Sequence, residues 1–167
     1  MSNPLVPPKS DGQIVVSSVN IEENGQRQPV NYVLPPGISR MFDSSQPQLL
    51  QQNEQALSMK ITDLSPADAR AVYKSTAYDL RRYKRLQMFA HAEAPIDESK
   101  TLSNGDFSVF IRLGSDYKNN YYEYEVPLDL TPHSTILYNT NNSADQEKVW
   151  PLNNTLNFKL ETLTDLK

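Results

Sequence analysis

The chain has no cysteine among its 167 residues and only five glycines. Without thiols, disulfides, thiolate nucleophiles and zinc–cysteine centres are excluded. No run approaches the ~20 consecutive apolar residues of a membrane helix, so no membrane-spanning segment is expected in this stretch. The sequence also contains no glycine-rich phosphate loop, no nucleophile elbow and no EF-hand loop. These absences remove several classes of enzyme and cofactor site.

Positive charge is also scarce, because 16 basic residues stand against 20 acidic ones and the formal net charge is −4. Nucleic-acid binding needs a clustered basic face, so no nucleic-acid partner is expected. One short basic run, Arg81, Arg82, Lys84 and Arg85, is the exception. A solvated turn is the favoured interpretation of such a run, ahead of a phosphate site.

Three runs with strand-like alternation lie in the centre of the chain: Arg85–Glu93, Asp106–Leu113 and Asn120–Leu130. Alternate side chains of a strand point to opposite faces, so the pattern predicts a sheet with one apolar face. The residues expected on that face are Leu86, Met88, Ala90, Ala92, Phe107, Val109, Ile111, Leu113, Tyr122, Tyr124, Val126 and Leu128.

The opposite face of these strands mixes aromatic rings with charges of both signs. This predicted mixed face is a candidate interaction face, made of Phe89, His91, Glu93, Phe110, Arg112, Tyr121, Glu123 and Glu125. Two interpretations stay open. The charges form a ladder of cross-strand ion pairs around Arg112 in solvent, or a second sheet or a ligand covers the face.

Further elements are expected outside the centre. Strands are predicted at Gln13–Val19, Pro29–Leu34 (joined to the first by a tight turn at Asn24-Gly25), Ala56–Leu64, Arg70–Lys74 and from Leu156 onward. Short helices are predicted at Gln48–Glu54, at Asp79–Lys84 and at the C-terminus. Residues Thr131–Gln146 read as a long polar loop, and Trp150 as a packed edge residue.

Short strands at regular intervals, with almost no helix until the end, predict a mostly β fold. The expected architecture is an antiparallel β-sandwich of jelly-roll type with one or two short helices and a C-terminal helix. Residues 1–28 are rich in proline and polar side chains, which predicts a flexible or loosely attached segment. Residues 29–167 are then a single β-sandwich domain.

Two pairs of side chains are candidates for catalytic chemistry. His91 and Glu93 share a face and could ligate a metal or exchange a proton, although a lone histidine on a sheet is more commonly a packed residue. Glu123 and Glu125 have the spacing of a glycosidase carboxylate pair, but any two such strand neighbours do. We therefore predict no enzyme activity, no metal and no cofactor.

Several longer segments resemble a known family. These are YVLPPGISR (Tyr32–Arg40), LLQQNEQALSMKITDL (Leu49–Leu64), RAVYKSTAYDLRRYKRLQMFAHAEA (Arg70–Ala94), FIRLGSDYKNNYYEYEVPL (Phe110–Leu128) and VWPLNN (Val149–Asn154). In this order they resemble the SprA family, also called Sov, over about Tyr32 to Lys167. This family supplies the outer-membrane translocon of the type IX secretion system, which serves protein export and gliding motility.

The resemblance implies a role that the residues alone do not indicate. Members form a very large transmembrane β-barrel, and this chain would be one soluble domain of such a protein. Its implied partners are the remainder of the same large chain, and a PorV-like cargo shuttle, a plug protein or secreted cargo. Its implied location is the outer membrane, as part of the parent protein.

A second resemblance, at the level of fold only, is to galactose-binding-like carbohydrate modules. Such modules bind sugars on aromatic platforms, and Tyr117, Tyr121, Tyr122 and Trp150 supply the residue types. A carbohydrate-binding jelly-roll module is therefore the alternative prediction, although tyrosines at strand ends are more commonly packing residues.

Overall fold

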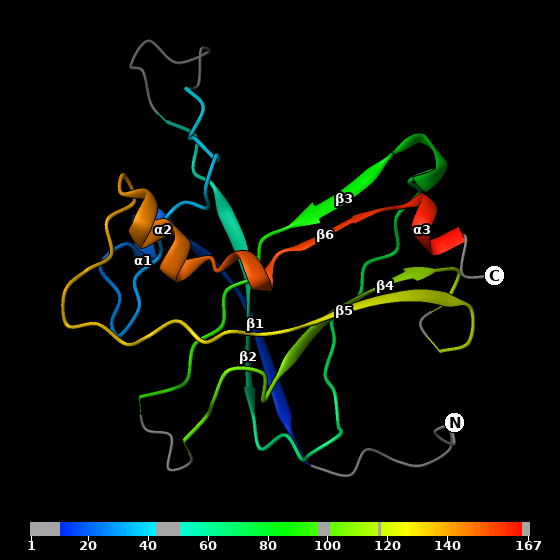
Figure 1. Ribbon diagram of the computed structural model, residues 1–167, viewed down its shortest axis with the longest axis horizontal. Helices are drawn as coiled ribbons and strands as arrows, with labels where there is room; N and C mark the ends of the chain where they lie inside the picture. The colour runs from blue at the N-terminus through cyan, green and yellow to red at the C-terminus, as the bar shows by residue number, and fades with distance from the viewer. Residues whose placement is uncertain (1–10, 43–50, 97–100, 117, 165–167) are drawn as a thin grey trace.

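A computed structural model describes residues 11–42, 51–96, 101–116 and 118–164. Its regular elements are mostly antiparallel strands with a few short helices, as predicted (Figure 1). The elements are β1 (Gln13–Asn20), α1 (Ile21–Asn24), β2 (Gln55–Thr62), the 3-10 turn η1 (Leu80–Arg82), β3 (Arg85–Met88), β4 (Ser108–Gly114), β5 (Tyr121–Pro127), α2 (Ser143–Val149), the 3-10 turn η2 (Leu152–Asn154), β6 (Leu156–Lys159) and α3 (Glu161–Thr164).

The strands form three sheets of two strands each, in the pairs β1–β2, β3–β6 and β4–β5. The antiparallel pairing is as predicted, whereas the described residues contain no larger sheet. The jelly-roll sandwich is therefore not confirmed. No helix within the described ranges is long and apolar enough to span a bilayer.

β1 and β2 form an eight-residue ribbon in which Gln13 lies opposite Thr62 and Asn20 opposite Gln55. One face of this ribbon, here called the apolar ribbon face, carries Ile14, Val16, Leu57, Met59 and Ile61. Val19 and Ala56, at one end of the other face, pack against the central core. The apolar ribbon face does not share this contact, so that Leu57 is 60% exposed although it directly follows Ala56.

β4 and β5 form the predicted central hairpin, with Ile111 opposite Tyr124 and Arg112 opposite Glu123. Burial alternates along most of both strands as the sequence indicates, except that Phe110 and Tyr121 on the mixed face are half-buried as well. The connection between the two strands follows Gly114, the last residue of β4, where the backbone leaves no room for a side chain. A Cβ there would lie 2.1 Å from the carbonyl oxygen of Asn120, so only glycine allows this approach.

β3 and β6 form a four-residue ribbon with Leu86 opposite Phe158. This pairing corrects the sequence prediction, which placed β3 beside the central hairpin. The two ribbons meet instead through stacked rings, because the ring centroids of Tyr124 and Phe158 are 4.3 Å apart. β3 also ends at Met88, so the predicted strand Arg85–Glu93 is only half formed.

The predicted hairpin between Gln13–Val19 and Pro29–Leu34 is wrong. The side chain of Asn20 caps a helical turn, α1, by accepting a hydrogen bond from the amide of Glu23. The chain therefore turns away at the end of β1, whose partner becomes β2. Residues 29–34 form no regular strand. Residues 11–28 thus contribute β1 and α1, while the predicted loose attachment of Met1–Gln28 stays a prediction.

The turn at Asp79–Lys84 is confirmed by η1, and the C-terminal strand and helix by β6 and α3. The strand predicted at Arg70–Lys74 is wrong, because these residues have no regular structure. Part of the helix predicted at Gln48–Glu54 lies outside the described residues, and the rest is not helical.

The helix α2 was not predicted, because its residues lie mainly in the polar segment read as a loop. Its local signal is present in the sequence. Asn142 accepts hydrogen bonds from the amides of Ala144 and Asp145, which makes it an N-cap. Asp145 in the first turn and Lys148 in the last complement the helix dipole. The helix delivers Val149 and Trp150 to the core.

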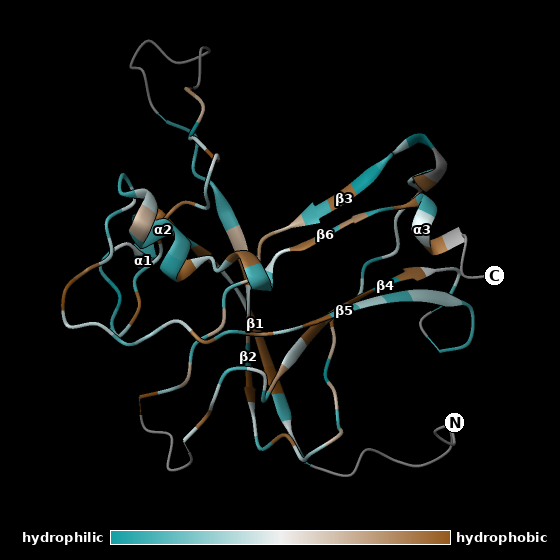
Figure 2. Ribbon diagram, in the orientation of Figure 1, coloured by the Kyte–Doolittle hydropathy of each residue, from teal (hydrophilic) through white to brown (hydrophobic). Residues whose placement is uncertain are grey.

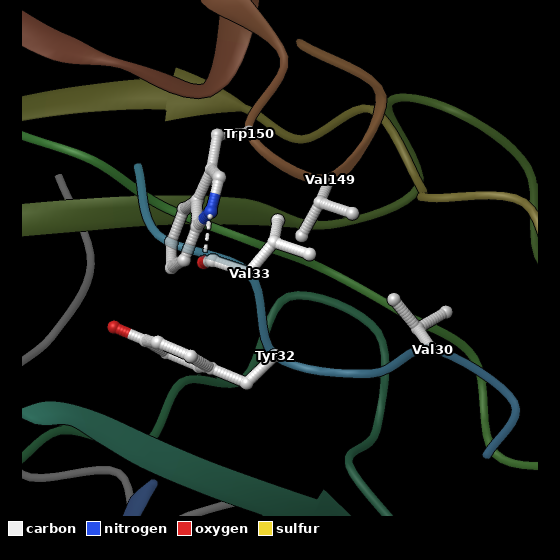
Figure 3. Packing of buried hydrophobic residues seen from close by; sticks show 5 residues of the cluster. All are labelled: Val30, Tyr32, Val33, Val149 and Trp150. Carbon is white, nitrogen blue, oxygen red and sulfur yellow. Dashed lines mark hydrogen bonds between the residues drawn. The ribbon is translucent and has the colours of Figure 1, made fainter. Parts of the chain in front are cut away.

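The central core is a cluster of five buried apolar side chains: Val30, Tyr32, Val33, Val149 and Trp150. Figure 3 shows the indole of Trp150 against the segment that carries Tyr32 and Val33. The indole nitrogen donates a hydrogen bond to the carbonyl oxygen of Val33, at 2.9 Å. An irregular segment before β2 is thus joined to the end of α2.

Buried asparagines hold the irregular segments around this core. The side-chain amide of Asn31 accepts from the backbone nitrogen of Tyr138 and donates to its carbonyl oxygen. Asn154 binds both backbone groups of Asp129 in the same way. Each side-chain amide therefore makes the two hydrogen bonds that a neighbouring strand would make in a sheet. These bonds satisfy backbone groups that are not paired with any strand.

Two leucines near β6 provide a matched test of this packing. Leu156 is fully buried, whereas Leu152 is 83% exposed. Leu156→Ala should lower the free energy of unfolding by about 2–5 kcal/mol, because it leaves a cavity. Leu152→Ala should change it by less than about 0.5 kcal/mol. Urea unfolding measures both, and similar costs for the two variants would contradict the packing described.

Candidate functional site

The residues of the predicted mixed face fall into two separate groups, because β3 pairs with β6 and not with the central hairpin. Phe110, Arg112, Tyr121, Glu123 and Glu125 lie on β4 and β5. Phe89, His91 and Glu93 follow β3 and lie at the core. Arg112 therefore pairs with Glu123, while Glu93, on the same predicted face, pairs with Arg27.

On the hairpin, Arg112 is the centre of the first group. Its Nε donates to Glu123 at 2.5 Å. Its guanidinium carbon lies 4.3 Å from the ring centroid of Tyr121 and 4.9 Å from that of Phe110. This group fits the interpretation as a ladder of cross-strand contacts. The ion pair with Glu123 and the cation–π contacts with Tyr121 and Phe110 explain why these residues lie together.

This hairpin face is open. The side chains of Arg112 and Glu123 are 35% and 33% exposed. Glu125, which accepts a hydrogen bond from the hydroxyl of Ser108, is exposed as well. No layer formed by the described residues covers the side chains of Arg112 and Glu123 on this face. The guanidinium of Arg112 occupies one side of the Tyr121 ring, so that side is not available to a sugar.

The second group surrounds Trp150. The rings of Tyr32, Phe89 and His91 lie edge-on to the indole, with centroids 6.0, 6.4 and 5.9 Å away. Trp150 itself is only 8% exposed, which makes it a core residue and not a platform for a ligand. Tyr117, the other predicted aromatic contact, lies outside the described residues.

His91 is a packed histidine in hydrogen-bond contact on both sides of its ring. Its Nδ1 lies 2.8 Å from the carbonyl oxygen of Val149 and 3.1 Å from the hydroxyl of Thr131. Its Nε2 lies 3.3 Å from a carboxylate oxygen of Glu93. The imidazole therefore joins the segment after β3 to the end of α2, and both nitrogens have partners within the protein.

Glu93 also receives both guanidinium nitrogens of Arg27, at 2.5 and 2.7 Å. Burial alone raises the pKa of Glu93, but the hydrogen bonds from His91 and Arg27 outweigh it and lower the pKa to about 2. Nothing in the sequence pattern marked Arg27 or Thr131, because their partners are 66 and 40 residues away in the chain.

The buried phenol of Tyr32 makes a further polar contact at the core. It donates to a carboxylate oxygen of Glu54, just before β2. Burial, followed by this hydrogen bond and the carboxylate charge, raises the pKa of Tyr32 well above its usual range. The phenol therefore stays protonated and serves as a structural donor.

A groove of about 1050 Å³ lies between the segment after Leu34 and the start of α2. Its apolar lining includes Ile21, Ile38 and Met41, and its polar lining comes mainly from residues around Asn141. Arg40, the charged residue of the lining, is already bound to Glu22 and to the carbonyl oxygens of Gln51 and Gln52. Among the described residues, no three histidine, aspartate or glutamate side chains gather as metal ligands.

Comparison with known proteins gives one finding. The SprA N-terminal family, described as motility related/secretion protein, matches residues 3–167. Its match extends over almost the whole chain, including the described elements from β1 to α3. The chain therefore belongs to the SprA N-terminal family, and the predicted resemblance is confirmed at that level. No curated protein matches the sequence.

The Arg27–Glu93–His91 contact generates a prediction for acid stability. The pKa of Glu93 is lower in the folded chain (about 2) than the ordinary value of 4.5. Its contribution is thus fully present above about pH 4.5 and is lost as the pH falls toward 2. Glu93→Gln should remove roughly 2–4 kcal/mol of this acid dependence.

Urea unfolding of both forms between pH 5 and pH 2.5, at roughly 0.1 M salt, measures the effect. The matched control is Glu125→Gln, which neutralises an exposed carboxyl group on the hairpin. Parallel pH profiles for Glu93→Gln and the unsubstituted chain would contradict the assignment.

Proposed function

We propose that this chain is a non-catalytic structural and interaction module of a type IX secretion outer-membrane translocon, with a part in protein export and gliding motility. The observation that carries the proposal is the family match over residues 3–167. Its partners are the remainder of the same large chain, with a PorV-like cargo shuttle, a plug protein or secreted cargo as further partners. Its location is the outer membrane, as part of the parent protein.

The small apolar core of the described residues supports a module that packs against other parts of a larger protein. Among the residues that the structure describes, the buried apolar side chains are the five of the central core together with Leu156, Phe158 and Leu163. Two-stranded ribbons are marginally stable on their own, and three or more strands or a packed helix are normally needed. Within the described part of the chain, the β1–β2 ribbon packs against α1 and the edge of the core, and Leu57 and Met59 on its apolar ribbon face are exposed.

We also propose that contacts in the assembled protein complete the predicted β-sandwich of jelly-roll type. Brown segments in β1 and β4 mark apolar residues on narrow ribbons (Figure 2). Val16 is 43% exposed and Met59 is 41% exposed, and they lie opposite each other in the register. Large exposed apolar patches mark interaction sites, so a neighbouring layer is expected on this face. No contact of the described residues favours the carbohydrate-binding alternative.

The test compares the same substitutions in two contexts. Leu57→Lys combined with Met59→Lys places two charges on the apolar ribbon face, at positions exposed in the chain alone. The matched control is Ser17→Lys with Thr62→Lys, at exposed positions on the other face of the ribbon. In the isolated chain, both pairs should change the free energy of unfolding by less than about 1 kcal/mol.

In the full-length protein, expressed in the cell that encodes it, the Leu57/Met59 pair should lower the amount of the protein and the export of its cargo several-fold, because the charges would be buried at an internal interface. The control pair should leave both near normal. Normal abundance and export for both pairs would contradict the proposed packing role.

A further inference from the structure

Some basic side chains of the described residues lie in ion pairs, and others, three of them close together in the chain, do not. Six of the described basic side chains have a carboxylate partner, in the ion pairs Arg27–Glu93, Arg40–Glu22, Arg70–Asp68, Arg112–Glu123, Lys148–Asp145 and Lys159–Glu161. Arg82, Lys84 and Arg85 have no ion pair with any side chain that the structure describes. In a chain of net charge −4, three unpaired cations within four residues are a local excess.

These cations share their segment with exposed aromatic rings. We call residues 78–85 the basic tip. Tyr78 is 70% exposed and Tyr83 is 55% exposed, and Leu80 between them is 38% exposed. Arg82, Lys84 and Arg85 are exposed as well. The acidic residue of the segment, Asp79, has interactions of its own.

The basic tip lies at an end of the fold. Figure 1 shows η1 at the outer end of the β3–β6 ribbon, close to α3. Arg85 is the first residue of β3 and lies opposite Lys159 of β6, which adds a further cation that Glu161 neutralises. The groove near α2 is lined by other residues, so the tip is a projecting turn outside it.

Three explanations of the tip can be compared. Charges on an edge strand prevent unwanted strand pairing, which explains Arg85 but not the exposed rings of the turn before it. In a complex with another protein, exposed anchor rings are expected to fill packed pockets of matching shape. A bilayer surface needs no matching pocket. Each phenol ring can enter the headgroup layer, and each cation can contact a phosphate.

We propose that the basic tip binds the anionic phosphate headgroups of a membrane surface. Arg82, Lys84 and Arg85 supply the charge, and each cation near an anionic membrane strengthens binding roughly fivefold. Tyr78, Leu80 and Tyr83 enter the interface beside them. This proposal does not depend on the proposed packing of the apolar ribbon face, since the two surfaces share no residue.

The test is sedimentation of the chain with lipid vesicles at about 0.1 M salt. Vesicles that mix phosphatidylglycerol with phosphatidylcholine should bind the chain, whereas vesicles of phosphatidylcholine alone should not. Binding should weaken as salt is raised, because the headgroup charge is screened. A chain that ignores phosphatidylglycerol vesicles would overturn the proposal.

Charge reversal with a matched control locates the site. The tip variant is Arg82→Glu with Lys84→Glu and Arg85→Glu. The control reverses three exposed lysines without an ion pair elsewhere in the described chain, Lys60, Lys74 and Lys118, so the net charge of the two variants is the same. The tip variant should lose at least about thirtyfold in vesicle affinity, and the control less than about threefold.

Equal losses in both variants would overturn the tip as the site. Tyr78→Ser with Tyr83→Ser should weaken the vesicle binding that remains at high salt. Unchanged binding at high salt would contradict insertion of the two rings into the interface. Retention on immobilised polyglutamate, with no binding to vesicles, would overturn it in favour of an acidic protein partner. Urea unfolding should give the same midpoint for all variants, because every substituted side chain is exposed.

Discussion

The contact between Trp150 and the segment that carries Val33 is the interaction on which the rest of the structure depends. The indole donates to the carbonyl oxygen of Val33 and is surrounded by the rings of Tyr32, Phe89 and His91. These residues come from parts of the chain that share no sheet. Because the three ribbons have only two strands each, the indole cluster supplies the long-range packing that the ribbons lack.

Polar contacts extend this cluster into the irregular part of the chain. Asn31 and Asn154 replace missing strand partners by binding both backbone groups of one residue each. His91 joins the cluster to Thr131 and, through Glu93, to Arg27. A side-chain amide or a carboxylate with a well-placed partner satisfies buried backbone and charged groups without regular structure. The fold thus has a well-connected centre and ribbons that project from it, as suits a module completed by neighbouring structure.

The sequence predicted the local elements better than their arrangement. Alternation identified β1, β2, β4 and β5, because a half-buried strand imposes a period of two on its own residues. It failed at β3, where Phe89 and His91 continue the alternation but pack on an indole that follows α2. It also failed at Pro29–Leu34, where Val30 to Val33 are all buried. The hydrogen bonds of this segment go to single groups such as the carbonyl oxygen of Asn24 and the hydroxyl of Thr140, and not to a neighbouring strand.

For the candidate site, the contact between Arg112 and Glu123 followed from cross-strand spacing, since the register of a hairpin is local. The partners of Glu93 did not, because Arg27 is brought to it by the turn after α1. Such a contact depends on tertiary folding, which no pattern in either segment records. The capping signal of Asn142 was readable, but it competed with a strongly polar composition that favoured a loop.

The dependence on Trp150 is open to direct measurement, because it is the only tryptophan of the chain. Urea unfolding followed by tryptophan fluorescence reports the central cluster, while far-ultraviolet circular dichroism reports the strands. If the ribbons depend on the indole cluster, the two transitions coincide. A fluorescence transition that is complete while the strand signal is still intact would show that the ribbons persist without the cluster, and would contradict this account.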